Sequence, residues 1–452
     1  MMNLRGLLKS NKNIGSCEAL AYYNVPGTNE KAGIYSFKIL TKTVSTDLSK
    51  ISNTIVCGNT AGYKDRCYIK PNLLQGNTSF IVFDCKGEFL QDTGHLMKAL
   101  GYKIKVLNLC YDNETIGLNR SDKYNPFIYL KTDKDIFDLA DALHKATKGF
   151  YRENRDPFYD NNVKLLLYSL LLYVHTEFSY EKQNFSTVLT LLENDMSNGG
   201  SLDLLFDKLP DYHFAKTIYK DYKKGGIPQQ EIETELLARL AVFKIDFIKE
   251  LTSTDTLELD KFGEEKSILY ILGSDIDFSL NCITSILYKQ AFQELFYSAD
   301  YKYMGKLPVP VHFIMDDFGA VKLFNSFDKI LGLSNSHNIF VSIIITNLAE
   351  LKKALPTSYE TILGICDEFL YTGGGCRDTY QYISELLENS LRKSISYDET
   401  RRLDNSKAIL FRQGKKSIID LKYDYSRHPN FKFTASAGFS ESGIYKPYIH
   451  GE

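Results

Sequence analysis

The sequence predicts an α/β protein, a doubly wound sheet into which an all-helical lobe is inserted. Over residues 50–110, short apolar runs alternate with helical patterns, as in a parallel sheet that helices cover. Over residues 135–251 the patterns become long and helical, and strand-like runs return from residue 267. These two changes of pattern indicate one α/β domain interrupted by helices.

Each expected element rests on its own pattern. The run SFIVFD at 79–84 is apolar and ends in an acid, which indicates a buried parallel strand. Residues 89–100 have helical spacing, and KIKVLNL at 103–109 is typical of the next strand. Later strands are expected at 267–273, 311–316, 340–346, 368–374 and 408–414.

These patterns divide the chain into segments. We expect an N-terminal segment over 1–50, the α/β domain over 51–135 and 260–425, the all-α insertion over 136–259, and a C-terminal tail over 426–452. The chain of 452 residues is long enough for this arrangement and for a substantial core.

Composition narrows the class of protein. The net charge of −2 excludes a globally basic nucleic-acid binder but allows a local basic channel. Eight scattered cysteines without a CxxC pair suit buried thiols in a reducing compartment better than a disulfide framework or a zinc site. The N-terminus lacks the apolar stretch of a signal peptide, and the apolar run 165–174 is about half of a membrane span. We expect a cytoplasmic protein with no transmembrane segment.

A loop near residue 60 suggests nucleotide chemistry. The string GNTAGYKD at 58–65 has most of the phosphate-binding pattern G-x-x-x-x-G-K-[ST]. However, Tyr63 stands at the second glycine and Asp65 at the hydroxyl residue. The candidate nucleotide-binding residues are Gly58, Thr60, Gly62, Lys64 and Asp65.

A second pattern supports the first. The run PVPVHFIMDDFGAV at 308–321 is an apolar strand that ends in Asp316 and Asp317. In P-loop motors the first such acid orients Mg²⁺ through its water, and its neighbour polarises the attacking water. Acid pairs also occur at strand ends without any chemistry. Together with the loop, the pair predicts catalytic acids, with Asp316 at the metal if nucleotide binds.

Several strings, in order along the chain, resemble the TraG/TraD-type conjugative coupling proteins, the P-loop motors of type IV secretion. They are KPNLLQGNTSFIVFDCKGEF (70–89), GYKIKVLNL (101–109), SDKYNPF (121–127), DPFYDNNVKLLL (156–167), HFIMDDF (312–318), ILGICDEFLYTGG (362–374) and DETRRLDNSKAILFRQGKKSI (398–418). The resemblance implies a RecA-like domain, a helical lobe facing the entrance of the secretion channel, and action on DNA as a ring. It also implies that the segment at Asp84–Glu88, which otherwise indicates a turn and a helix start, lies near the nucleotide.

The departures from this family fall on its chemical positions. Tyr63 and Asp65 are two of these departures, and Asp317 is a third, because it replaces the usual Glu. Thr346 replaces a Gln that senses the γ-phosphate. Asn335 replaces the Arg that reaches the nucleotide of a neighbouring subunit, and His337 is nearby in the sequence. A carboxylate about 4 Å from another anion costs roughly 4 kcal/mol at an effective dielectric of about 20. The five changes together predict lost hydrolysis.

The resemblance and its departures lead to two hypotheses. The first is a pseudo-ATPase of conjugative transfer that binds DNA or relaxase-type protein cargo. It would act together with type IV secretion components or with an active paralogue, and it would form a homo- or hetero-oligomer. The second is an active ATP-driven DNA translocase with an atypical loop, using ATP and Mg²⁺. Most members of that family carry an N-terminal membrane anchor, which we do not find in this sequence, and this departure weakens the expectation of a complete coupling protein. A location at the inner face of the cell membrane is a further expectation.

Overall fold

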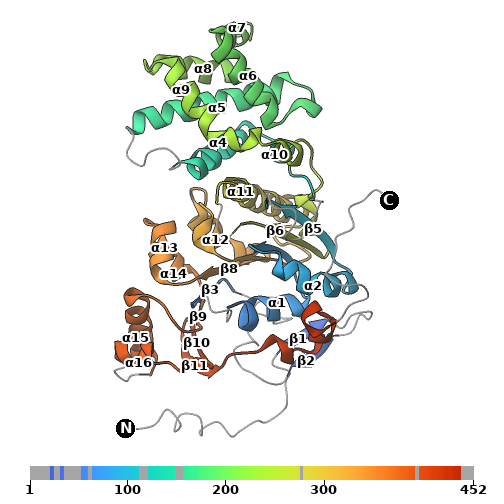
Figure 1. The fold of residues 1–452 in the computed structure, drawn as a ribbon, viewed down its shortest axis with the longest axis vertical. Helices are drawn as coiled ribbons and strands as arrows, with labels where there is room; N and C mark the ends of the chain where they lie inside the picture. The colour runs from blue at the N-terminus through green and yellow to red at the C-terminus, as the bar shows by residue number, and fades with distance from the viewer. Residues whose placement is uncertain are drawn as a thin grey trace.

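The computed structural model describes residues 21–24, 31–34, 52–59, 64–110, 121–148, 156–274, 278–391 and 396–438. Within these ranges the chain forms a nine-stranded sheet, below a helical lobe in the view of Figure 1, and a separate two-stranded ribbon. The ribbon pairs β1 (Ala21–Asn24) with β2 (Lys31–Ile34) in antiparallel fashion.

The large sheet has the order β11-β10-β9-β3-β8-β7-β4-β6-β5. Its strands are β3 (Thr54–Cys57), β4 (Ser79–Asp84), β5 (Lys103–Asn108), β6 (Ser267–Leu272), β7 (Val311–Met315), β8 (Ile339–Ile345), β9 (Glu368–Tyr371), β10 (Lys407–Arg412) and β11 (Lys415–Leu421). The strands from β9 to β5 are parallel, whereas β10 and β11 are antiparallel to their neighbours. The doubly wound sheet that the sequence predicts is confirmed.

Alternate side chains of the strands enter two different cores. Ile55 and Ile81 belong to the larger core, and their neighbours Val56 and Val82 belong to the core on the other face. This period of two explains why the strands are apolar throughout, because parallel strands covered by helices on both faces have no solvated side.

Helices cover both faces of the sheet. The first group is the short π-helical turn η4 (Asp65–Ile69), α1 (Lys70–Gln75) and α2 (Glu88–Ala99). The second is α11 (Asn281–Tyr297), α12 (Phe327–Ser334), α13 (Leu348–Ala354), α14 (Tyr359–Ile365), α15 (Arg377–Leu391) and α16 (Tyr397–Arg401). Phe292 of α11 stacks on Phe313 of β7 with ring centroids 4.1 Å apart, which locks the longest of these helices onto the sheet.

The helical lobe lies between β5 and β6 in the chain and forms the upper part of Figure 1. It contains α4 (Asp133–Thr147), α5 (Pro157–Glu177), α6 (Phe185–Asn198), α7 (Ser201–Asp207), α8 (Phe214–Lys224), α9 (Gln229–Arg239) and α10 (Asp246–Leu251). Its buried side chains join those of α11 and the sheet in one continuous apolar cluster. No helix among the described residues combines the length and the apolar content needed to cross a membrane.

Two strand ends differ from the sequence prediction. The strand expected at 368–374 ends at Tyr371, because Gly373, Gly374 and Gly375 all have positive φ values, of 99°, 81° and 141°. The strand expected at 408–414 ends at Arg412, where Gly414, at φ 67°, turns the chain into β11. The strand β11 was not predicted from the sequence.

The described part of the C-terminal segment, to residue 438, packs against the sheet domain. The side chain of Asn430 donates to the main-chain oxygen of Leu74 at 2.8 Å. The main-chain N–H of Ser436 donates to Asp92 at 2.8 Å, and Asp92 also pairs with Lys70 at 2.9 Å. These contacts hold the segment on α1 and α2.

Candidate functional site

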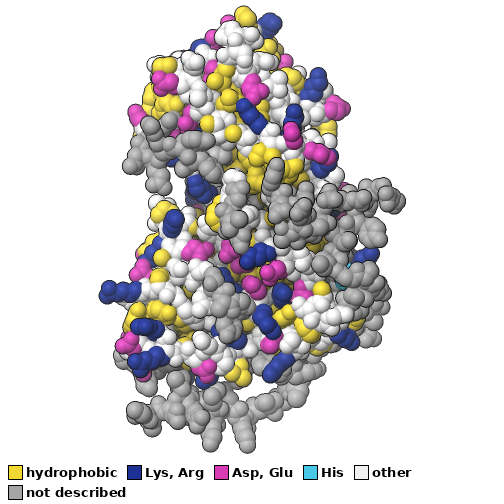
Figure 2. All heavy atoms as spheres, viewed as in Figure 1, with side chains coloured by type: hydrophobic (Ala, Val, Ile, Leu, Met, Phe, Trp, Pro, Cys, Tyr) yellow, Lys and Arg dark blue, Asp and Glu magenta, His cyan; other side chains and the backbone are white. Residues whose placement is uncertain are grey.

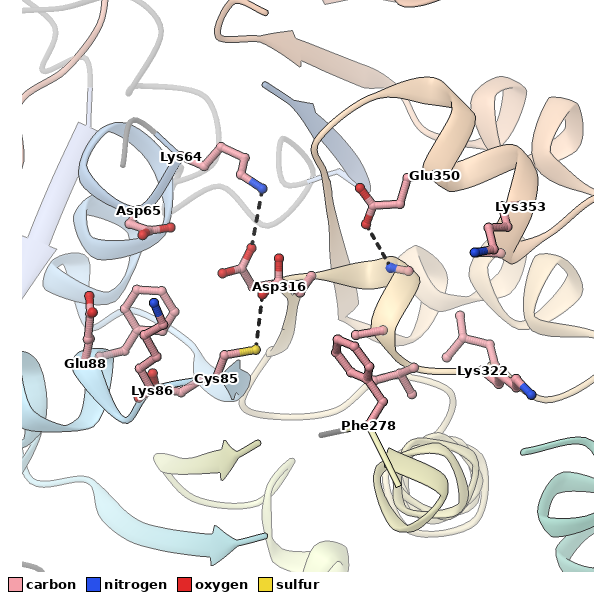
Figure 3. A pocket seen from close by; sticks show the side chains of 18 of the residues that line it. Lys64, Asp65, Cys85, Lys86, Glu88, Phe278, Asp316, Lys322, Glu350 and Lys353 are labelled. Atoms are coloured by element: carbon pink, nitrogen blue, oxygen red, sulfur yellow. Dashed lines mark hydrogen bonds and ion pairs between the residues drawn. The ribbon is translucent and has the colours of Figure 1, made fainter. Parts of the chain in front are cut away.

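The carboxyl ends of β3, β4, β7 and β8 meet at one edge of the sheet, beneath the helical lobe. A cavity of about 920 Å³ opens there (Figure 3). Its lining residues are Lys64, Asp65, Asp84, Cys85, Lys86, Glu88, Phe89, Lys145, Phe278, Asp316, Asp317, Gly319, Ala320, Val321, Lys322, Leu323, Glu350, Lys353 and Ala354. The volume lies within the range typical of small-molecule sites, and the edge is where ligands of open α/β sheets bind.

The phosphate-loop candidates enter this edge from β3. The main-chain N–H of Gly58 donates to Ile345 of β8 at 3.1 Å, and a Cβ on Gly58 would stand 1.8 Å from Thr372 Oγ1. Gly58 is therefore required for the close packing of β3 beside the end of β9. Thr60 and Gly62, with Tyr63, lie outside the described residues.

Lys64 brings an ammonium group to the strand ends. It precedes η4, is only 5% exposed, and places Nζ 3.9 Å from Oδ1 of Asp316, as the dashed line in Figure 3 shows. The same oxygen accepts no hydrogen bond from a described residue. The two groups therefore face each other with a separation too long for a hydrogen bond.

Asp316 and Asp317 follow β7 but have different surroundings. Burial raises the pKa of Asp316 to about 8, with Lys64 opposing the rise and Asp317 and Asp65 adding to it. Asp317 has a positive φ of 44°, and its Oδ2 accepts a hydrogen bond from the Cys85 thiol at 3.1 Å. The sequence-predicted pair is thus brought beside Lys64.

Asp65 adds a third carboxyl group near the same ammonium. Burial raises its pKa, Lys64 lowers it, and Glu88 and Asp317 raise it further. Both Asp65 and Glu88 line the cavity on the left side of Figure 3. The surroundings of Lys64 are therefore rich in carboxyl groups that oppose one another's ionisation.

The segment after β4 is both a helix start and a wall of the cavity. Gly87 has a φ of 69° and precedes α2, and the carboxylate of Asp84 accepts from the main-chain N–H of Leu90 at 2.9 Å. Burial raises the pKa of Asp84 to about 7, although this hydrogen bond lowers it. Asp84 and Glu88 both line the cavity. The expected helix start is confirmed, and the expected position near a nucleotide stays a prediction.

Thr346 ends β8 and is bound to a residue that the sequence did not single out. Its N–H and hydroxyl donate to Glu350 Oε2 at 2.7 and 2.6 Å. The other oxygen of Glu350 accepts from the main-chain N–H of Gly319 at 2.9 Å. Glu350 therefore links the loop after β8 to the loop after β7. The only sequence signal is Glu350 at the third position after Asn347, which indicates a helix start.

Asn335 and His337 lie away from the cavity. They form the turn η11 (Asn335–His337) directly before β8, at the amino edge of the sheet. Oδ1 of Asn335 is buried and accepts no hydrogen bond from a described residue, while His337 lies 3.0 Å from Asp300. The predicted role of this position concerns the nucleotide of a neighbouring subunit, so it stays a prediction.

Two positions of the loop differ from the usual Mg²⁺–triphosphate pattern. Lys64 supplies the cation of that pattern, whereas Tyr63 and Asp65 stand at the positions of its second glycine and its hydroxyl residue. Among the described residues, no group of three or more His, Cys, Asp or Glu side chains is arranged to hold a metal ion.

The sheet order, the phosphate-loop position after β3 and the acids after β7 define a RecA-like P-loop protein. The chain belongs to the family described as type IV secretory system conjugative DNA transfer, which matches residues 28–394. No curated protein matches the sequence.

Solved structures share this fold. The plasmid coupling protein TrwB with the ATP analogue ADPNP is 13% identical, with a TM-score of 0.59 over 84% of this chain and 87% of that one. TrwB with ADP and Mg²⁺ is 12% identical, with a TM-score of 0.57 over 84% and 87%. VirB4 of Thermoanaerobacter pseudethanolicus is 10% identical, with a TM-score of 0.50 over 91% and 98%.

Proposed function

We propose that this protein is a coupling-protein-like component of conjugative DNA transfer with a degenerate ATP site. In this function it binds DNA or relaxase-type protein cargo and hydrolyses little ATP. The observation that supports the proposal is the group of carboxyls around Lys64, namely Asp65, Asp316 and Asp317. Family membership supports the pathway, and the departures at the loop support the loss of turnover.

The electrostatic argument concerns where a triphosphate would lie. Catalysis of phosphoryl transfer depends on positioning and on cations that stabilise the phosphate charge. Here one ammonium faces Asp316 at 3.9 Å, and Asp65 occupies the next position of the loop. A nucleotide would have to compete with these carboxyl groups for Lys64, which weakens both binding and turnover.

The same geometry permits an alternative, an active DNA translocase with an atypical loop. Lys64 remains at the correct strand end, and Oδ1 of Asp316 is buried and accepts no hydrogen bond from a described residue. TrwB, which shares the fold, was crystallised with ADP and Mg²⁺. ATP and Mg²⁺ are the candidate cofactors of this alternative.

The parts of the chain have separate roles in the proposal. Residues 51–135 and 260–425 form the motor-type domain, and 136–259 form the all-helical lobe that faces the entrance of the secretion channel. Type IV secretion components or an active paralogue complete the machine, in a homo- or hetero-oligomer. We place it in the cytoplasm, at the inner face of the cell membrane where the secretion channel opens.

Calorimetry of Mg²⁺–ATP tests the proposal. We expect no micromolar binding by the native protein and restored binding by the double variant Tyr63→Gly with Asp65→Thr. Adding Lys64→Ala to that variant is the control, because it must abolish any binding that uses the loop. Micromolar binding by the native protein, with hydrolysis stimulated by single-stranded DNA, would establish the active translocase instead.

A further inference from the structure

Two cysteines lie close together where β3 and β9 end side by side. Cys57 is the last residue of β3 and pairs with Tyr371, the last residue of β9 (Figure 1). After β9 the chain turns through the three glycines 373–375 and reaches Cys376, directly before α15. The main-chain N–H of Asn59 donates to the oxygen of the first of these glycines at 3.0 Å, so the turn stays beside the end of β3.

One hydroxyl group lies between the two thiol groups. Oγ1 of Thr379, in the first turn of α15, is 3.4 Å from Sγ of Cys376. The same hydroxyl forms a hydrogen bond with the thiol of Cys57, and the charge of Cys376 acts on that thiol as well. The main-chain N–H of Leu348 donates to Oγ1 at 3.0 Å and fixes its position. The two sulfur atoms therefore lie on either side of a single hydroxyl group, and both cysteines are free.

Cys376 has the surroundings of a reactive thiolate. Its side chain is partly exposed, so a small solute reaches it. Burial raises the pKa of its thiol, whereas the hydroxyl group of Thr379 and three main-chain N–H groups lower it further, to below the value of an ordinary thiol. These N–H groups belong to Thr379, Ala349 and Asp378. Hydrogen bonds to sulfur at the start of a helix favour the thiolate, which is the form that oxidants attack.

The thiol of Cys57 has the opposite character. It is completely buried, and burial raises its pKa, which Lys64 only partly opposes. The two residues thus combine an accessible thiolate with a buried, protonated thiol. Cys85 shows that partial exposure alone does not produce a thiolate, because its thiol donates to Asp317 at 3.1 Å, and burial together with this carboxylate raises its pKa.

We propose that Cys376 and Cys57 form a peroxide-sensitive dithiol site, in which a hydroperoxide oxidises Cys376 and Cys57 then closes an intramolecular disulfide bond. In the first step the sulfur of Cys376 attacks one oxygen of the peroxide, the O–O bond breaks, and hydroxide leaves. The product is a sulfenic acid at Cys376. In the second step the sulfur of Cys57 bonds to that of Cys376 and the S–O bond breaks. The proton of the Cys57 thiol joins the leaving hydroxyl group to form water, and the hydroxyl group of Thr379 offers a path for it.

The glycine turn allows the movement that the disulfide requires. Gly373, Gly374 and Gly375 have positive φ values, and glycine changes its backbone angles with little steric cost. The bond would tie the residue directly before Gly58 to the start of α15. In the oxidised chain the base of the phosphate-type loop is therefore held in one position. This inference does not depend on whether the loop binds nucleotide.

Mass spectrometry of the oxidised native protein tests the proposal. The folded chain is treated with hydrogen peroxide, its remaining thiols are alkylated, and it is digested without reduction. We expect a peptide pair linked through Cys57 and Cys376, the loss of two free thiols per chain, and the recovery of both thiols with dithiothreitol. Because this measurement uses the native sequence, it does not depend on how well a variant folds.

The variant Cys57→Ser separates the two steps. Its sulfenic acid at Cys376 has no partner, so we expect it to accumulate and to be trapped by dimedone, with no linked peptide. Cys110→Ser is the matched control, because the Cys110 thiol donates to the main-chain oxygen of Gly273 at 3.0 Å and serine keeps such a donor. We expect this control to form the same disulfide as the native protein.

The proposal is overturned if Cys376 stays reduced while Cys85 or Cys110 is oxidised. It is also overturned if Cys376 is oxidised in the native protein without a link to Cys57, or if its disulfide joins two copies of the chain, as non-reducing electrophoresis would show. None of these outcomes affects the Mg²⁺–ATP experiment on the loop variants, so failure here leaves the degenerate-site proposal standing.

Discussion

Glu350 accepts a hydrogen bond from the main-chain N–H of Gly319 at 2.9 Å, and this contact joins two loops of the candidate site. Gly319 follows the acids at the end of β7, whereas Glu350 lies on α13, after β8. The second oxygen of Glu350 holds Thr346 at the end of β8. One carboxylate therefore fixes the spacing of the two loops without any bound ligand.

This contact leads to the first prediction, for Gly319→Ala. A Cβ on Gly319 would stand 2.6 Å from Cγ of Glu350, so the carboxylate must move and lose hydrogen bonds. We expect a loss of about 1–3 kcal/mol of unfolding free energy, measured by urea denaturation. Gly364→Ala is the control, because a Cβ at this position meets nothing within 4 Å. An alanine in a helix raises the unfolding free energy by as much as about 1 kcal/mol relative to glycine. Equal stability changes in the two variants would contradict the role of Glu350.

The second prediction concerns a buried carboxyl pair in the helical lobe. Burial raises the pKa of Glu233 from 4.5 to about 7, and its hydrogen bond to Asp195 raises it too, while Gln229 and Lys223 lower it. The folded protein keeps this proton at pH values where the unfolded chain has released it. The contribution of Glu233 to stability therefore falls as the pH rises from about 4.5 to about 7.

Glu233→Gln removes this titration while keeping a donor for Asp195. We expect the variant to gain stability relative to the native protein between pH 5 and pH 7.5, measured by urea denaturation at both values. Glu231→Gln, at an exposed position of the same helix, controls for the loss of a negative charge. A difference between variant and native protein that does not change with pH would refute the prediction.

The third prediction concerns Arg239, which attaches α9 to α5. Its guanidinium is buried and lies 2.8 Å from Asp160 and 2.9 Å from Glu235. Arg239→Leu would leave Glu235 as a buried carboxylate without this cation. We expect a loss of about 3–5 kcal/mol in urea denaturation, because removing the cation from a buried ion-pair network is strongly destabilising.

An exposed ion pair of the same lobe is the comparison for Arg239. Lys224 and Asp221 are 2.8 Å apart at the surface, so Lys224→Leu should change stability by less than about 1 kcal/mol. If Arg239→Leu costs no more than Lys224→Leu, the buried network does not hold the lobe together.

Many charged side chains of both signs lie side by side on the face of the molecule in Figure 2. This mixture agrees with the net charge of −2 and with the absence of a globally basic composition. Any anion binding must therefore come from a local arrangement of cations, which the net charge does not reveal.

The sequence by itself determined most elements of the large sheet, although not β11, and the edge of the sheet that carries Lys64, Asp316 and Asp317. It could do so because strands buried on both faces are apolar runs, and because a loop after one strand and acids after another must meet where parallel strands end. The roles of these residues in nucleotide chemistry, and those of Thr346 and Asn335, remain predictions.

Only the tertiary structure decided the contacts between distant segments. In the folded chain Glu350 lies between two loops, and Asn335 lies at the amino edge of the sheet. Lys145, Lys353 and Phe278 line one cavity. No local sequence pattern predicts these contacts, because each depends on how remote elements pack near the sheet. Packing between remote elements, rather than periodicity along the chain, sets which side chains share a site.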